Sequence, residues 1–435
     1  MKKIFLFALI IAGFTAQSQN VLTLEEAIAT ALQNNYDIQL SKNDSAVAAL
    51  DYSYRNAVFL PRLNGNIGAT WNKNNQKQDF NNGTKREGDV KTNNLTGSLA
   101  LNWTLFDGLK MFATRDKAAE LIKLGELGIK NQIVNTISSV INTYYGVVRQ
   151  KQQLKAIEEQ IGISDIRATL AERRLDIGVG TKPDVLQSKV DLNAQKAAQL
   201  TQQTLIAQLK EQLNQAMNVT SGTVYEVADS IPLNTGIQLS DIQGNIASTN
   251  PALLITQKNI DIANYTLKER KAERFPTVSF NTAYNLNRTN NDITLNPALP
   301  VFSRNRGLNY GISAAIPILN GFNTKRLIRQ AQLDVEFGQL QYANQKSQIN
   351  LAVVNAFRDY EQQKKSLALE EENILLAKEN VSIALEVYRL GGSTIVQLRE
   401  AQISLEAAYN RLIAARYNMK LSETELLRLK GELVK

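Results

Sequence analysis

The sequence predicts an α+β membrane protein with an internal two-fold repeat, in which long helices flank pairs of β-strands. Three observations predict this class: matching segments recur about 213 to 215 residues apart, long helix-forming tracts lack proline, and four segments alternate apolar and polar residues. Four strands do not close a membrane barrel, so several chains must contribute. Two copies would give a narrow pore. Three copies would give a trimeric 12-stranded outer-membrane β-barrel, with four strands per chain, continuous with a long α-helical coiled-coil barrel.

The start of the chain predicts a secretory signal peptide over residues 1–18. Lys2 and Lys3 precede an apolar run, and small and polar residues follow it, with cleavage expected between Ala16 and Ser18. The apolar run is shorter than a typical membrane helix, and no other run approaches 18 consecutive apolar residues. A chain of this kind that lies in a membrane must do so as a β-barrel.

The composition argues against an enzyme. The 435 residues include no histidine and no cysteine, which removes the commonest metal ligand and every Ser-His or Cys-His arrangement. Only carboxylates remain as catalytic groups, and no concentrated acid pair stands outside the helix faces. We expect no enzyme activity, metal or cofactor. The formal net charge of +8 is spread among acids along helical tracts, which favours solvated helix faces over a nucleic-acid partner.

Two copies of one unit account for the whole chain. Pro61 and Pro276 occupy corresponding places before the first strand of each copy. The predicted organisation is a first repeat over 19–218, a linker over 219–247 and a second repeat over 248–435. Each repeat consists of a helix, a strand, a loop, a second strand, a long helix, a turn and a return helix.

Four segments with a period of two predict strands. In a soluble sheet their apolar face would pack on a core, whereas in a barrel it would meet lipid. Strand length, interface aromatics and the signal peptide favour the barrel. The expected strands cover about 62–72, 93–106, 277–288 and 308–317, with polar loops over 72–93 and 289–307.

Long helices follow each strand pair. The tract from about 110 to 176 would extend roughly 100 Å as one helix. Two interruptions, the tip turns 177–185 and 390–398, each contain a glycine followed six residues later by a polar residue. After the second turn an apolar heptad predicts a coiled-coil seam. Its large positions are Leu398, Leu405, Leu412, Met419, Leu426 and Leu433, and its small positions include Ala401, Ala408 and Ala415.

In order and duplication these features resemble the TolC family of outer-membrane factors. The resemblance rests on Pro61 and Pro276, on the F-D-G and L-N-G steps at 106–108 and 319–321, and on both glycine turns. It implies a homotrimer in the outer membrane of a Gram-negative bacterium, in contact with outer-membrane lipid, with its helical barrel in the periplasm. It also implies an equatorial belt that includes the linker.

The family resemblance further implies a passive exit duct in a tripartite efflux or type I secretion system. Its partners would be a periplasmic adaptor protein and an inner-membrane RND or ABC transporter. Cargo selectivity would belong to the transporter, so drugs, metals and proteins all remain open as cargo. The alternative function is a trimeric coiled-coil structural or adhesive cell-surface protein without transport.

The resemblance also assigns site residues at the turns. Adaptor docking would involve the following residues at the periplasmic tip: Gly178, Gly180, Asp184, Gly391, Gly392 and Gln397. The alternative is that the glycines merely end helices, since a reversal requires positive φ or close backbone approach. Asp184 and Gln397 are expected to cap the returning helices.

The pore gate would involve Tyr388, Arg399, Glu400 and Asp184. Here Gln397 replaces an acid of the family pattern, so Glu400 would form a single ring or pair with Arg399 of a neighbouring chain.

Overall fold

The computed structural model describes residues 21–293 and 300–433, so the expected signal peptide lies outside the described residues. None of the described helices combines the length and the apolar character needed to cross a membrane. In the first repeat the elements are β1 (Val21–Leu22), α1 (Leu24–Asn34), α2 (Tyr36–Ser53), the short 3₁₀ helix η1 (Arg55–Phe59), β2 (Arg62–Asp79), β3 (Lys85–Phe106), α3 (Lys110–Asp176) and α4 (Lys182–Met217). The remaining elements are β4 (Glu226–Val227), α5 (Leu239–Gln243), α6 (Ile246–Thr249), α7 (Pro251–Ala272), β5 (Thr277–Ile293), β6 (Phe302–Ala315), α8 (Asn323–Arg389) and α9 (Ile395–Lys430).

The helix lengths confirm the internal repeat. Helices α3 and α8 each contain 67 residues, and the return helices α4 and α9 each contain 36. At 1.5 Å per residue, each longer helix extends roughly 100 Å. The same two lengths in the same order require that both copies keep the same spacing between strand, turn and return helix.

The chain forms two compact units. The first contains residues up to 43 together with 127–254 and 344–435, and the second contains 44–126 and 255–343. Both repeats therefore contribute to both units, because α3 and α8 each supply residues to one unit and then to the other.

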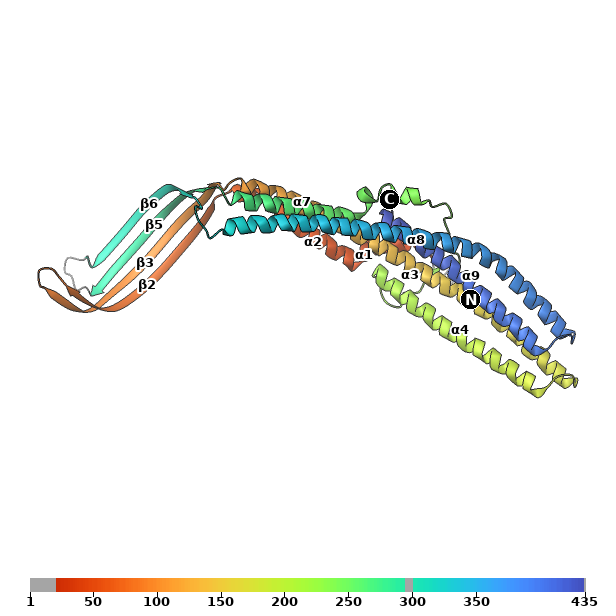
Figure 1. The fold of residues 1–435 in the computed structure, drawn as a ribbon. Helices are drawn as coiled ribbons and strands as arrows, with labels where there is room; N and C mark the ends of the chain where they lie inside the picture. Colours follow the sequence, from red (N-terminus) through yellow and green to blue (C-terminus); the bar gives the residue numbers. More distant parts are fainter. Residues whose placement is uncertain (1–20, 294–299, 434–435) are drawn as a thin grey trace, which may run out of the picture. The chain divides into compact units, whose positions relative to one another are not determined.

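The second unit contains an antiparallel four-stranded sheet in the order β2-β3-β5-β6 (Figure 1). Its strands extend further than the alternating pattern predicts, and the polar segment expected as a loop over 72–93 is mostly strand. Cross-strand pairing accounts for the extension, because ion pairs join β2 to β3 beyond the apolar stretch. These pairs are Lys73–Asp89 at 3.3 Å, Lys77–Glu87 at 3.3 Å and Lys85–Asp79 at 4.0 Å.

The strand register gives this sheet an apolar face and a polar face. The apolar face includes Leu63, Ile67, Trp71, Leu95, Leu99, Trp103, Phe280, Tyr284, Leu286, Leu308, Tyr310 and Ile312. Its side chains are open to the surroundings, with Ile67 90% exposed and Tyr310 77% exposed. On the polar face, side chains join neighbouring strands, as where Asn281 Nδ2 donates to Ser313 Oγ at 2.9 Å.

Short sequence signals explain how strands and helices join in the second unit. Proline precedes Arg62 of β2 and Thr277 of β5, and it favours an extended backbone at the residue before it, as at Leu60 with ψ of 148°. After β3, the carboxylate of Asp107 accepts hydrogen bonds from the Met111 amide at 3.1 and 3.2 Å. The aspartate of the F-D-G step therefore satisfies a free amide in the first turn of α3.

A hydrophobic core in the first unit brings the chain start and the linker together. Ala27 and Ala31 of α1 pack with Tyr144 of α3, Leu213 of α4 and Val227 of β4. Strands β1 and β4 pair in parallel, and Tyr144 Oη donates to the Leu22 carbonyl at 2.8 Å. The segment expected as a linker over 219–247 therefore contains buried core residues and regular elements.

The predicted heptad seam is buried along α9 from Leu398 to Leu426, whereas its last position, Leu433, lies beyond the helix and is half-buried. Leu398, Met419 and Leu426 are each 0% exposed, and the small residues between them are also buried. Figure 1 shows α9 running beside α8 after the turn that joins them. Large and small apolar residues alternate along this buried seam.

Candidate functional site: the paired helical turns

Both helical turns use the same backbone arrangement. Gly178 follows α3 with φ of +80°, and Gly391 follows α8 with φ of +83°. Each helix end is closed by a hydrogen bond spanning five residues, from the Val179 amide to the Arg174 carbonyl at 2.9 Å in the first turn and from the Gly392 amide to the Val387 carbonyl at 2.9 Å in the second. This is the Schellman arrangement, in which a left-handed glycine ends the helix.

The second glycine of the first turn has a different role. A Cβ added at Gly180 would lie 2.8 Å from the Leu175 amide nitrogen and 2.9 Å from the Arg174 carbonyl carbon. In the second turn the position matching Gly180 is Ser393, and a Cβ added at Gly392, which matches Val179, would lie 3.2 Å from Val387 Cγ1. A side chain at Gly180 would therefore force the backbone of the first turn to shift, whereas the second turn has a serine at the equivalent position.

Threonines cap the return helices, so the expectation that Asp184 and Gln397 are the caps is wrong. Thr181 Oγ1 accepts a hydrogen bond from the Asp184 amide at 3.4 Å, and Thr394 Oγ1 accepts one from the Gln397 amide at 3.4 Å. The Gln397 side chain in turn accepts from the Thr394 amide at 3.0 Å, which completes a capping box. Both predicted residues occupy the third helical position, one turn beyond the cap.

Tyr388 of the predicted gate is buried against the first hairpin. Arg174 Nη1 donates to the Tyr388 carbonyl oxygen at 3.0 Å, and the Arg174 guanidinium carbon lies 4.9 Å from the centre of the Tyr388 ring. Burial raises the pKa of the Tyr388 hydroxyl, with the charge of Asp184 adding to the effect and those of Arg174 and Arg167 opposing it. Tyr388 therefore stays neutral, and Arg174 links the ends of α3 and α8.

A buried ion pair lies further along the same helices. Arg167 is 2% exposed and donates to Asp191 Oδ2 at 2.7 Å and to Gln402 Oε1 at 2.6 Å. Desolvation lowers the pKa of Arg167, and the adjacent Asp191 opposes that effect. Arg399 Nε lies 3.4 Å from the same Asp191 oxygen. Together with Glu406 these side chains line a polar cavity of about 190 Å³.

The structure separates the remaining predicted gate residues. Arg399 pairs with Asp191 of its own chain, and Glu400, the next residue, is exposed. Within the described residues no ion pair involves Glu400. Asp184 is half-buried in the first turn of α4, where its charge reaches Tyr388. Tyr388 and Arg399 therefore face the first hairpin, in which Asp184 lies, and Glu400 has no ion pair with it.

Sequence reasoning missed Arg167, Arg174, Asp191 and both capping threonines, Thr181 and Thr394. Arg167, Arg174 and Asp191 carry no local signal, since their partners lie on another helix and, for Gln402, Arg399 and Tyr388, in the other hairpin. Thr394 could have been found, because a threonine followed three residues later by glutamine is the capping-box pattern.

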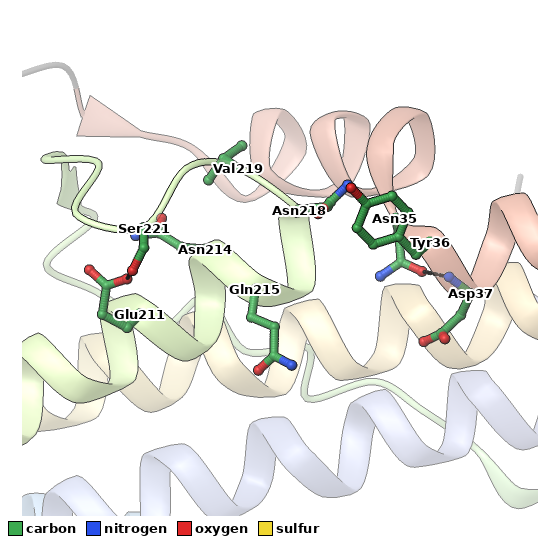
Figure 2. Close-up of a pocket in the computed structure, with 9 residues that line it drawn as sticks. All are labelled: Asn35, Tyr36, Asp37, Glu211, Asn214, Gln215, Asn218, Val219 and Ser221. Atoms are coloured by element: carbon green, nitrogen blue, oxygen red, sulfur yellow. Dashed lines mark hydrogen bonds between the residues drawn. The ribbon is translucent and has the colours of Figure 1, made fainter.

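A second polar cavity, of about 460 Å³, lies in the first unit between the start of α2 and the end of α4 (Figure 2). Asn35 Oδ1 accepts from the Asp37 amide at 2.9 Å, and Glu211 accepts from Ser221 Oγ at 2.6 Å. These contacts hold a helix start and a loop, so they indicate a structural role. No group of three or more acidic side chains placed to hold a metal ion occurs over residues 21–293 and 300–433.

Comparison with known proteins agrees with this architecture. The chain is 22% identical over 448 residues to the outer membrane efflux protein BepC of Brucella suis, covering 99% of this chain and 91% of the relative. It is 22% identical over 452 residues to the outer membrane protein TolC of Escherichia coli, covering 100% of this chain and 87% of that one.

Solved structures share the fold at low identity. The outer-membrane channel OprN has a TM-score of 0.76 at 17% identity, covering 94% of this chain and 90% of that one. The outer membrane channel CmeC of Campylobacter jejuni has a TM-score of 0.76 at 15% identity, covering 95% and 87%. The family model described as outer membrane efflux protein matches residues 27–219 and 244–432. The chain therefore belongs to the outer membrane efflux protein family, a family of outer-membrane channels and not of enzymes.

Proposed function

We propose that this protein is the exit duct of a tripartite efflux or type I secretion system. It conducts substrates passively across the outer membrane, and a periplasmic adaptor with an inner-membrane RND or ABC transporter supplies them. The observation that carries the proposal is the repeated pair of 67- and 36-residue helices joined to a sheet with an exposed apolar face. A structural or adhesive coiled coil would have no use for such a sheet.

The relatives leave both cargo classes open. AprF of Pseudomonas aeruginosa is named for alkaline protease secretion, and TtgC of Pseudomonas putida for toluene efflux. A duct that serves either class needs a wide, polar lumen. The polar face of β5 and β6 fits this need, since asparagine, serine, threonine and glycine dominate it.

The working unit is a homotrimer. Strands β2 and β6 are the edges of the four-stranded sheet, and each presents a row of unpaired backbone groups in the single chain. In a lipid bilayer such groups must find partners, and pairing β6 of one copy with β2 of the next satisfies them. Three copies give an even strand number with a pore of useful width.

The two turns form the docking surface for the adaptor. Each turn presents exposed apolar side chains beside glycines: Ile177 is 74% exposed and Val179 62%, while Leu390 is 78% exposed. The caps and Schellman bonds hold these side chains on a fixed backbone, which lowers the entropy lost on binding. The docking residues Gly178, Gly180, Gly391 and Gly392 shape this surface without contributing contact area.

The gate is the set of contacts between the two hairpins. Tyr388 and Arg399 of the second hairpin are held by Arg174 and Asp191 of the first. An opening in which the hairpins separate must break these contacts. Glu400, which has no described ion pair in the single chain, is left for a contact with a neighbouring copy.

Two experiments test the proposal. Purified protein in planar bilayers is expected to form ion-conducting pores from cross-linkable trimers; a protein without conductance would overturn the duct. For docking, Val179→Asp combined with Leu390→Asp should lower export in cells while trimer level stays constant. The matched control is Val224→Asp, at a loop position that is 81% exposed and outside both turns. Undiminished export by the double variant would remove the docking assignment.

A further inference from the structure

The apolar face of the sheet ends in a group of basic side chains, which we call the basic rim. It consists of Lys73, Lys91, Arg288, Arg304 and Arg306. Every strand contributes at least one of them, on the loop side of its main apolar stretch, and on β6 Phe302 lies beyond the two arginines on the same face. On β2, for example, Lys73 follows Trp71 on the same face, and on β5 Arg288 follows Leu286.

The rim places like charges directly opposite each other. Lys73 pairs in register with Lys91, and Arg288 pairs with Arg304. Opposed like charges on one face of an antiparallel pair are destabilising, since their Cβ atoms lie about 5 Å apart. Two such pairs on one face favour the binding of a compensating anion.

Protein carboxylates supply only part of that compensation. Asp89 lies 3.3 Å from Lys73. In the part of the chain that the structure describes, no ion pair joins Arg288 or Arg306 to a carboxylate. The Arg288 guanidinium instead lies 5.5 Å from the centre of the Phe302 ring, a contact that leaves its N–H groups available.

The rim lies on the face that meets lipid and not on the face that would line a pore. Over Thr277–Ile293 and Phe302–Ala315 the polar face carries no charged residue, whereas Arg288, Arg304 and Arg306 all share the apolar face with Tyr284 and Leu308. A ligand for these arginines therefore approaches from the membrane. Cargo in the lumen would not reach them.

The depth of the rim matches a lipid headgroup layer. The apolar stretch of each strand covers about ten residues, which at ~3.3 Å per residue and ~45° tilt spans roughly 25 Å, the height of an outer-membrane apolar band. The rim follows directly after that band, at the end of the sheet away from the junctions with η1, α3, α7 and α8. Guanidinium groups at this level bind phosphate oxygens bidentately.

We propose that the basic rim binds the phosphate groups of an anionic lipid in the outer leaflet of the outer membrane, with Arg288, Arg304 and Arg306 as its centre. The leaflet assignment rests on the proposed function, because it requires the helices to lie in the periplasm. The bound headgroups neutralise the opposed arginines and fix the height of the barrel in the membrane. The occupant is a phosphorylated lipid, and free phosphate lacks the acyl chains that would pack on Trp71 and Leu308.

The test uses full-length trimers in phosphatidylcholine vesicles. A trace of a fluorescent lipid is added, whose headgroup is a glucosamine disaccharide with two phosphate groups, and its retention by the protein is measured. Wild-type protein is expected to retain this lipid and to release its dephosphorylated form. The double variant Arg288→Gln/Arg306→Gln should bind it about 25-fold more weakly, at about fivefold per basic residue. The matched control Lys77→Gln/Lys85→Gln removes the same charge from the same face, at residues already paired with Glu87 and Asp79, and should change binding by less than about twofold.

Several outcomes would overturn the lipid site. If wild-type protein retained the phosphorylated and dephosphorylated lipids equally, the lipid site would be excluded. It would also be excluded if the control variant lost as much lipid binding as the arginine variant. Displacement of the lipid by inorganic phosphate would identify a free-anion site instead. Conductance measured on the same trimers keeps the two proposals apart: pores that conduct without lipid preference remove only the lipid site, whereas lipid preference without conductance removes only the duct.

Discussion

Arg174 at the end of α3 donates a hydrogen bond to the carbonyl oxygen of Tyr388 at the end of α8, at 3.0 Å, and its guanidinium stacks over the Tyr388 ring. The two residues are 214 positions apart. This one side chain therefore ties the last turn of one hairpin to the last turn of the other, beside both glycine turns.

Replacing Arg174 should loosen the gate. In Arg174→Gln the hydrogen bond weakens and the cation–π contact is lost, a change of about 1.4 kcal/mol that corresponds to roughly tenfold in the ratio of open to closed channels. Single-channel recording in planar bilayers measures this ratio. The neighbouring Arg173, which is exposed in the same helical turn, provides the control as Arg173→Gln. Equal behaviour of the two variants would remove Arg174 from the gate.

For the buried pair of Arg167 and Asp191, we expect removal of one charge to lower the stability more than removal of both. Asp191→Asn leaves Arg167 as a buried cation without its carboxylate, which should destabilise the helical hairpins by roughly 3 kcal/mol. The double variant Arg167→Met/Asp191→Leu should recover most of that loss, because it removes both charges.

Guanidinium midpoints of the helical circular dichroism signal measure these changes. The control Asp165→Asn, at an exposed position of α3, should stay within about 0.5 kcal/mol of the wild type. A single variant as stable as the control would contradict the cost assigned to the unpaired Arg167.

The glycines of the first turn should respond unequally to alanine. Gly178→Ala meets no described atom within 4 Å, so it should cost only the positive-φ penalty of about 1 kcal/mol. Gly180→Ala drives a methyl group into the backbone of Arg174 and Leu175 and should cost roughly 2–3 kcal/mol.

Thermal unfolding of the purified trimer compares these two variants. Gly162→Ala, in the interior of α3 where no described atom lies within 4 Å, should instead stabilise by roughly 0.5–1 kcal/mol through helix propensity. A larger loss at Gly178 than at Gly180 would show that backbone strain and not crowding sets the limit at this turn.

Acid should weaken the first unit through Asp229. Hydrogen bonds from Lys151, at 2.7 Å, and from Lys155, at 2.9 Å, hold the pKa of the Asp229 carboxyl below its usual value. A carboxyl with a depressed folded-state pKa contributes stability above its unfolded pKa of about 3.9, and that contribution disappears as the pH falls through the lower folded value.

The variant Lys151→Met tests this contribution together with that of the Lys151–Glu226 ion pair, at 3.1 Å. Its stability should fall short of the wild type at neutral pH, and the shortfall should shrink below about pH 4 as Asp229 is protonated in both proteins. Unfolding midpoints across the pH range measure the difference. A shortfall that stays constant down to pH 2 would assign the effect to packing of the lysine stem.

The strand boundaries illustrate how far the sequence pattern reaches. Apolar alternation stops near Trp71 and Asn93, so the sequence pattern places the strand ends there. In the structure β2 continues to Asp79, and β3 begins at Lys85. The extension depends on pairs such as Lys77–Glu87, whose charges carry no signal until the register brings them together. The caps are a different case, because Thr394 and Gln397 form a local pattern that the sequence already contains.

The sequence by itself determined the internal repeat, the helix lengths, the alternating faces of the sheet and the glycine turns, because each depends on residues close together in the chain or on matching spacing between two copies. Only the tertiary structure decided the pairing of Arg167 with Gln402, which are 235 positions apart, and that of Arg174 with Tyr388. Such contacts depend on how two hairpins pack against each other. A single polar residue on a helix face gives no indication of which of several facing residues it will meet.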